Sequence, residues 1–202
     1  VEENRRRSKI EPEFELIDTG VFDENRYFDV FIEYGKGSPE DLLMRISVHN
    51  RGPEEARVHV IPQIWFRNTW SWGRSAGPRP LMEATKADAI RIRHQALGDR
   101  WLFTEEKGVL LFCENETNNH RLYSIPEASG YFKDGINDYV VLGIHDAVNP
   151  AQRGTKAAVH YLFSIPAGSG IELRMRLTDR LIEHPFSAFD KTMSQRGKEA
   201  DE

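Results

Sequence analysis

The chain lacks the features that mark several large classes of protein. It contains a single cysteine, Cys113, so no disulfide bond can form within it. No apolar run is long enough to cross a bilayer, and the N-terminal residues do not resemble a signal peptide. Positive charge does not predominate either, because the formal net charge is −5 and the isoelectric point is near 5.9. We therefore expect neither a membrane nor a nucleic acid as partner.

Sequence patterns for cofactors are missing as well. The seven histidines show no metal-ligand spacing such as HxxxH. No glycine-rich loop precedes a helix in the way that phosphate-binding sites require. We expect no metal and no other cofactor. Cys113 lies in the apolar run 109–113, where a buried structural thiol is the expected role.

Alternation of apolar and polar residues indicates β-strands through most of the chain. In 42–50, for example, Met44, Ile46 and Val48 alternate with polar residues, which is the period of a half-buried strand. Turn-forming residues separate the runs. The predicted strands are 27–34, 42–50, 56–66, 89–95, 101–104, 109–114, 139–144, 155–165 and 171–178.

Many strands with few helical stretches indicate an all-β fold, an antiparallel β-sandwich. The predicted boundaries are an irregular lead-in over 1–12, a sandwich over 13–184 and a short C-terminal helix over 185–202. Phe186, Phe189 and Met193 give that last segment its helical spacing. We expect 68–88 to form a long loop and 115–138 to form a structured loop, so that only the C-terminal segment is helical.

The first candidate site lies in the tryptophan-rich segment 67–73. If the segment is extended, Trp70 and Trp72 point to one side, as sugar-stacking rings do. Arg67 and Asn68 beside them are placed to hydrogen-bond hydroxyl groups. The alternative is that the rings fill the edge of the sandwich or pack on another domain, and that the polar pair fixes the loop.

The second candidate site is a polar turn around Gly135. Asp134 and Asp138 form a carboxylate pair four residues apart, a spacing open to acid–base chemistry or to binding a hard cation, and Asn137 lies between them. Side-chain bonds to the backbone of a tight turn are the simpler interpretation. The preceding residues Glu114, Glu116, Asn118 and Asn119 predict a hydrogen-bonded loop, with substrate contact as the alternative.

Several long segments resemble the N-terminal β-sandwich domain, of the supersandwich type, of bacterial proteins related to glycoside hydrolase family 63. The resemblance runs from Glu11 to the end of the chain and rests on rare residues at fixed places. Its main segments are IPQIWFRNTWSWG (61–73), ENETNNHRLY (114–123), KDGINDYVV (133–141), NPAQRGTKAAVHY (149–161) and FDKTMSQRGKEADE (189–202).

The resemblance implies a cytoplasmic bacterial α-glucosidase of the inverting type. In that family a C-terminal barrel of paired α-helices supplies the acid and the base, so no catalytic residue is assigned to this chain. Segment 189–202 would begin the helix that leads to the barrel. The sandwich would support the barrel and shape the entrance for an oligosaccharide substrate. The alternatives are a carbohydrate-binding module that uses Trp70 and Trp72, and a purely structural interaction domain.

Overall fold

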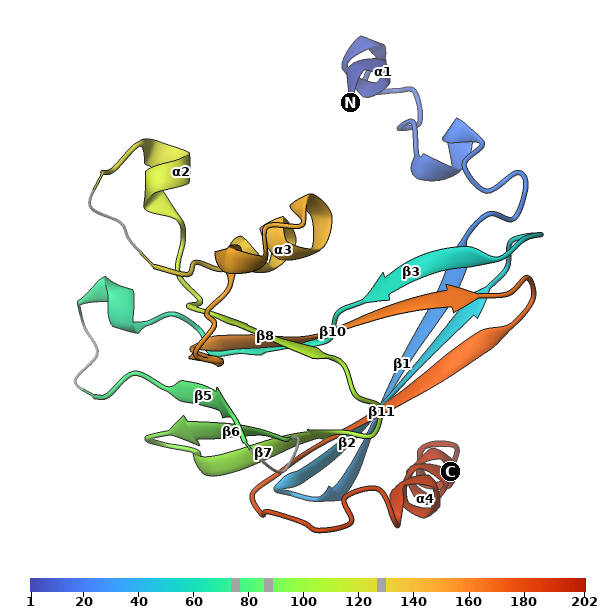
Figure 1. The fold of residues 1–202 in the computed structure, drawn as a ribbon. Helices are drawn as coiled ribbons and strands as arrows, with labels where there is room; N and C mark the ends of the chain where they lie inside the picture. Colours follow the sequence, from blue (N-terminus) through green and yellow to red (C-terminus); the bar gives the residue numbers. More distant parts are fainter. Residues whose placement is uncertain (74–76, 86–88, 127–129) are drawn as a thin grey trace.

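Two antiparallel β-sheets packed face to face confirm the predicted β-sandwich (Figure 1). The computed structural model describes residues 1–73, 77–85, 89–126 and 130–202. In these residues, the first sheet has the strand order β1-β2-β11-β7-β6-β5-β9, and in the second β10 pairs with β3, β4 and β8. The first sheet contains β1 (Phe28–Ser38), β2 (Asp41–Asn50), β5 (Leu81–Ala84), β6 (Ala89–His94), β7 (Gly98–Thr104), β9 (Arg153–Gly154) and β11 (Gly170–Thr178). The second contains β3 (Ala56–Val60), β4 (Gln63–Trp65), β8 (Val109–Cys113) and β10 (Lys156–Ile165).

The main core lies between the sheets and follows the predicted alternation. Ile46 and Val48 of β2 face inward with Leu173 of β11, against Phe112 and Val159 of the second sheet. The predicted strand 56–66 is divided into β3 and β4, because Pro62 has no backbone N–H to donate to the ladder. Its carbonyl still accepts a hydrogen bond from the Val159 N–H, at 3.0 Å.

The prediction of a strand over 139–144 was wrong, because this segment belongs largely to helix α3 (Gly135–Leu142). Ile136, Tyr139 and Val140 occur at i, i+3 and i+4 and pack against the outer face of the second sheet, on Leu111 and Ala158. Valine favours strands, but this preference is weak compared with the effect of tertiary packing. The helical spacing of the apolar residues therefore decides the structure of this segment.

Helical structure also extends beyond the C-terminal segment, contrary to the prediction. The predicted loop 115–138 contains the short helix α2 (Asn119–Tyr123) and the start of α3. The Asn118 side chain caps α2 by accepting a hydrogen bond from the Arg121 N–H at 3.0 Å. Near the N-terminus lie α1 (Glu2–Arg6) and the 3₁₀-helix η1 (Leu16–Thr19), and the first strand starts only at Phe28. The predicted loop 68–88 contains the 3₁₀-helix η2 (Trp70–Trp72) and the strand β5, which pairs with β6, so it is not loop throughout. Its residues 74–76 and 86–88 lie outside the described residues.

The predicted C-terminal helix is present as α4 (Phe189–Ala200), which packs on the outer face of the first sheet (Figure 1). Phe189 is only 1% exposed and forms a small separate cluster with Leu43 and Met193. The guanidinium carbons of Arg45 and Arg174 lie 5.7 and 5.3 Å from the centre of its ring, a cation–π arrangement. Among the described residues, no helix is both long enough and apolar enough to cross a membrane.

The structure gives Cys113 a measurable signature. Burial in β8 raises the pKa of its thiol to about 12, since burial disfavours the thiolate. In the unfolded chain the thiol ionises near pH 9, so the folded state holds more protons between these values. The free energy of unfolding is therefore expected to fall as pH rises through that window. A chromogenic disulfide reagent should label Cys113 at pH 8 only in urea.

The control for this prediction is Cys113→Ala, which removes the titrating group. The alanine variant should lose less stability between pH 9 and 11 than the wild type does, as measured by urea unfolding at each pH. Equal labelling rates in buffer and in urea would show that the native thiol is accessible and the prediction wrong.

Candidate functional site

The two predicted site segments are held together by residues 114–118, here called the bridging segment. It begins directly after β8, where the Glu114 carboxylate accepts a hydrogen bond from the Thr155 hydroxyl at 2.7 Å. That hydroxyl accepts in turn from the Asn115 N–H at 2.8 Å, and the Asn115 amide donates to the Phe66 carbonyl at 2.7 Å. The network ties the main chain at Phe66, directly before the tryptophan-rich segment, to Asn115 and Thr155. The predicted hydrogen-bonded loop is therefore observed at these positions.

Trp70 is held by the bridging segment through Glu116. The indole Nε1–H donates to the Glu116 carboxylate at 2.7 Å, and the Arg79 guanidinium lies 3.2 Å from the same oxygen. Glu116 is about three-quarters buried, so this charge-assisted bond is less screened than a surface pair. The Trp70 ring is thus fixed in place, with one polar edge satisfied by the protein.

The tryptophan segment is not extended, so the basis for a shared face was wrong. Trp70–Trp72 form the 3₁₀-helix η2, whereas side chains two apart share one side only in an extended segment. The Trp72 side chain lies outside the described part of the structure. Asn68 fixes the loop, because its side-chain oxygen accepts a hydrogen bond from the Ser71 N–H at 3.1 Å.

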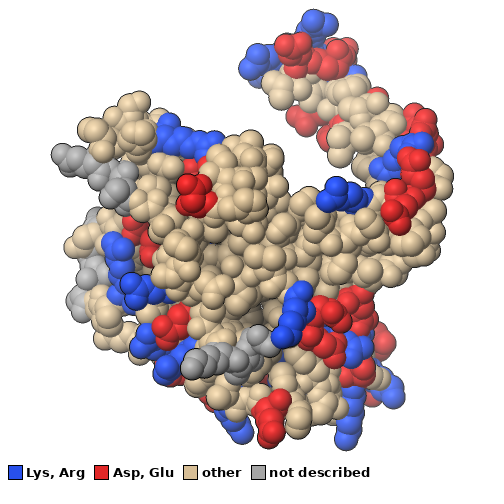
Figure 2. Space-filling model, viewed as in Figure 1, with Lys and Arg blue, Asp and Glu red and all other residues tan. Residues whose placement is uncertain are grey.

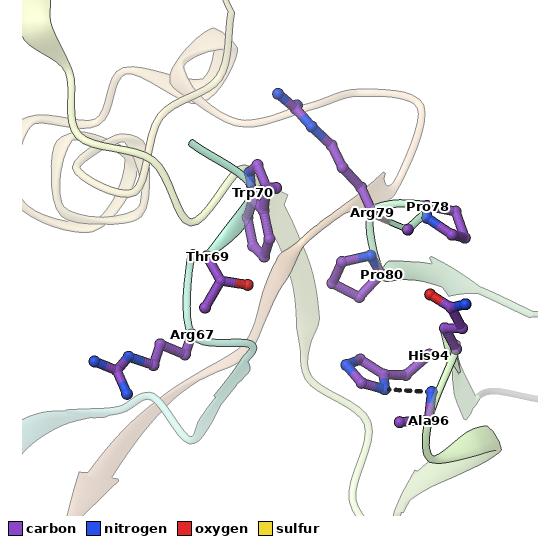
Figure 3. A pocket seen from close by; sticks show the side chains of 10 residues that line it. Arg67, Thr69, Trp70, Pro78, Arg79, Pro80, His94 and Ala96 are labelled. Atoms are coloured by element: carbon purple, nitrogen blue, oxygen red, sulfur yellow. Dashed lines mark hydrogen bonds between the residues drawn. The ribbon is translucent and has the colours of Figure 1, made fainter. Parts of the chain in front are cut away.

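A pocket of about 360 Å³ opens beside Trp70 (Figure 3). Two of the predicted residues, Arg67 and Trp70, line it. The full lining is Arg67, Thr69, Trp70, Gly77, Pro78, Arg79, Pro80, His94, Gln95 and Ala96. Its size falls within the range of small-ligand sites, and an indole, an imidazole and an amide suit a polar ligand with an apolar face.

His94 is positioned in this pocket by contacts on two sides. Its ring stacks on Phe66 with centroids 4.7 Å apart and an interplanar angle of 22°. Its Nδ1 accepts hydrogen bonds from the Ala96 and Leu97 N–H groups, both at 3.2 Å. A neutral imidazole that accepts at Nδ1 carries its proton at Nε2, so His94 is a hydrogen-bond donor at that atom.

The second predicted cluster is an ion-pair network around Arg121. The Arg121 guanidinium lies 3.1 Å from the Asp134 carboxylate and 2.8 Å from that of Asp138. Asn118 of the bridging segment donates to Asp134 at 3.1 Å, whereas Asn137 is exposed and 3.5 Å from Asp138. The side-chain bonds to Asp138 and then Asp134 raise the pKa of Arg121. We expected a tight turn held by side-chain-to-backbone hydrogen bonds. The structure instead has the start of helix α3 here, held by ion pairs with Arg121.

Both carboxylates accept hydrogen bonds from the same guanidinium, an arrangement that fixes the start of α3 beside α2. Within the described ranges, no group of three or more histidine, cysteine, aspartate or glutamate side chains is placed to hold a metal ion. The described geometry is suited to binding and to fixing loops.

Sequence reasoning missed the arginines that organise both clusters and the role of His94. Arg79 stands nine residues after Trp70 in a proline-containing loop, and no local pattern marks it. Arg121 had a signal, since it stands three residues after Asn118, at the N3 position of a helix that asparagine can cap. Recognising α2 would have placed its side chain beside the acidic turn.

Comparison with known proteins finds a similar protein but assigns no activity to this chain. No family model matches the chain. It is 32% identical, over 246 aligned residues, to an uncharacterized protein of Saccharomyces cerevisiae, YMR196W. The match covers the whole chain but only 23% of the yeast protein, so the corresponding segment there is part of a much longer polypeptide. Neither comparison bears on glycoside hydrolase family 63.

Proposed function

We propose that this chain is a non-catalytic β-sandwich domain of a family 63-like glycoside hydrolase of the α-glucosidase type. In this proposal it supports the α-helical catalytic barrel of the same polypeptide and shapes the entrance for an oligosaccharide. One observation carries the proposal furthest: the two segments expected at the entrance, 67–73 and 131–138, are both tied to the bridging segment. Glu116 bonds Trp70, and Asn118 bonds Asp134.

The pocket beside Trp70 offers chemistry that suits a sugar. An aromatic ring can stack on the apolar face of a pyranose. The Nε2–H of His94 and the side-chain amide of Gln95 supply donors for hydroxyl oxygens around the same space. Because Glu116 fixes the indole, little side-chain freedom is lost when a sugar binds.

The test is enzymatic and uses the full-length polypeptide beside the 202-residue chain. We expect glucose release from α-linked disaccharides by the long form alone. In the long form, Trp70→Ala should raise KM about tenfold, the loss of roughly 1.4 kcal/mol of stacking, with kcat changed less than twofold. The matched control is Trp65→Ala, because Trp65 is exposed on β4 and does not line the pocket. Comparable activity in the short chain would refute a non-catalytic role.

A carbohydrate-binding module is the second candidate, and the pocket is the observation that favours it. This role predicts that the isolated chain binds maltose-type sugars saturably and that Trp70→Ala weakens the binding. Titration calorimetry decides between the two roles. No heat of binding by the isolated chain, together with the KM effect above, would leave the entrance-shaping role and remove the independent module.

A further inference from the structure

The N-terminal arm (residues 1–27) is ordered by its own bonds but leaves its apolar side chains without cover. The Asn4 amide donates to the Phe14 carbonyl at 3.0 Å and accepts from the Phe14 N–H at 2.5 Å. Arg7 lies over the Phe14 ring at 5.3 Å. A capping box between Glu15 and Asp18 fixes η1. The arm is therefore a shaped element.

The arm exposes more of its large apolar side chains to solvent than is usual on the surface of a monomeric protein. Ile10 is 95% exposed and Ile17 is 72% exposed, and Leu16, Val21 and Phe22 are exposed as well. Single exposed apolar residues are ordinary, but here five large ones are exposed within thirteen positions. Figure 1 shows that the arm projects away from the sandwich. The sandwich therefore does not cover these side chains.

A second uncovered set lies on α2, α3 and the residues that follow them, here called the α2–α3 lobe. The inner side of α3 is packed on the second sheet through Ile136. Six other large apolar residues of the lobe are exposed, each at 43% or more. These residues are Leu122, Tyr123, Ile125, Val141, Leu142 and Ile144.

The arm and the lobe rise from the same side of the second sheet, with β3 and β10 between them (Figure 1). The space-filling view shows a hollow between the two whose visible surface is mostly uncharged (Figure 2). The outward residues of these strands include Leu162, which is exposed, and the stacked pair His59 and His160. The Nδ1 of His59 and the Nε2 of His160 are 2.8 Å apart, so the pair shares a hydrogen bond.

We propose that the arm, the α2–α3 lobe and the outer face of β3 and β10 form one docking surface for a second folded domain of the same polypeptide. The fitting partner is a convex and mainly apolar surface, because the hollow is concave and its visible surface is mostly uncharged. The yeast relative supports this occupant, since more than three-quarters of that protein lies outside the matched segment. The inference rests on the proposed multidomain organisation, but it does not depend on α-glucosidase activity.

The test introduces a charge on the arm by Ile17→Glu, with Leu181→Glu as the matched control. Leu181 is 61% exposed but lies in the loop between β11 and α4, away from the hollow. In the isolated chain neither variant should shift Tm, because Ile17 touches too little to lose. In the full-length polypeptide, Ile17→Glu should lower Tm by several degrees and Leu181→Glu should not.

Amide hydrogen exchange supplies a second measurement on the unmodified protein. Arm and α2–α3 amides should exchange at least about tenfold more slowly in the full-length polypeptide than in the isolated chain. Equal exchange in both forms, or equal Tm shifts for the two variants, would overturn the proposal. An isolated chain that dimerises until Ile17→Glu is introduced would assign the surface to a second copy instead. If the long form docks the arm but releases no glucose, the proposed function fails and this inference stands.

Discussion

Gly135→Ala is expected to lower the free energy of unfolding by about 3 kcal/mol, because the position has no room for a side chain. A methyl group built on Gly135 would overlap the carbonyl oxygen of Ala147 and come within 3.1 Å of its carbonyl carbon. Both atoms are backbone atoms, so no side-chain rotation relieves the overlap. Either α3 or the 3₁₀-helix η3 (His145–Ala147) must shift.

The same shift should disturb the candidate site. Gly135 lies between Asp134 and the first full turn of α3, which carries Asp138. Moving the start of this helix separates the two carboxylates from Arg121, whose bonds to them require both positions. Urea unfolding measures the stability change, and exchange of the α3 amides shows whether the start of the helix has moved.

Gly197→Ala is the matched control for this prediction, and its sign should be opposite. Gly197 lies in α4, and a methyl group there meets nothing within 4 Å. Alanine in an exposed helix should stabilise the protein by about 0.5–1 kcal/mol, because it restricts the unfolded chain. If Gly135→Ala proved as mild as Gly197→Ala, the close approach of α3 to Ala147 would not exist in solution.

Strands whose side chains alternate were predictable, and elements held by distant contacts were not. Three predicted strands agree closely with β2, β10 and β11, namely 42–50, 155–165 and 171–178. Their alternation of apolar and polar residues indicates which face of each strand is buried. The segment Tyr139–Val140–Val141 has strand-forming residues in a row and still becomes helical. Its helix forms because Ile136, three residues earlier, completes an apolar face that fits the second sheet.

The residues of the candidate site were partly predictable, but their connections were not. Aromatic and acidic residues stand out in a sequence, so Trp70, Asp134 and Asp138 could be selected. Glu116 and Trp70 are separated by 46 positions, and Thr155 and Glu114 by 41. Both pairs depend on β10, which pairs with β8 (Cys113 opposite Lys156) and with β4 (Trp65 opposite Lys156). A shift of one residue in that register would turn each side chain to the other face.

Phe189→Ala is expected to remove about 3 kcal/mol from the stability of α4 while leaving the main core folded. Phenylalanine-to-alanine changes at buried sites cost about 3–5 kcal/mol, and the lower figure applies because the Phe189 cluster is small. Leu43, Phe189 and Met193 form a unit separate from the core between the sheets. The substitution also removes the ring that Arg45 and Arg174 cover from two strands.

Because this cluster is separate from the main core, hydrogen exchange can test the prediction region by region, which a measurement of global stability cannot do. Amides of α4 should exchange about a hundredfold faster in Phe189→Ala, whereas those of β2 and β11 should change much less. Lys191→Ala, at an exposed position of the same helix, should alter neither.

Uniform loss of protection in both sheets would mean that α4 is part of the sandwich's cooperative unit. Local loss would mean that α4 is a separately anchored helix, held by Phe189 and by the pairing of Asp190 with Arg45 and Arg174. The orientation of any domain attached through α4 would then depend on that anchor, because a helix released from the sheet no longer fixes the direction of the chain.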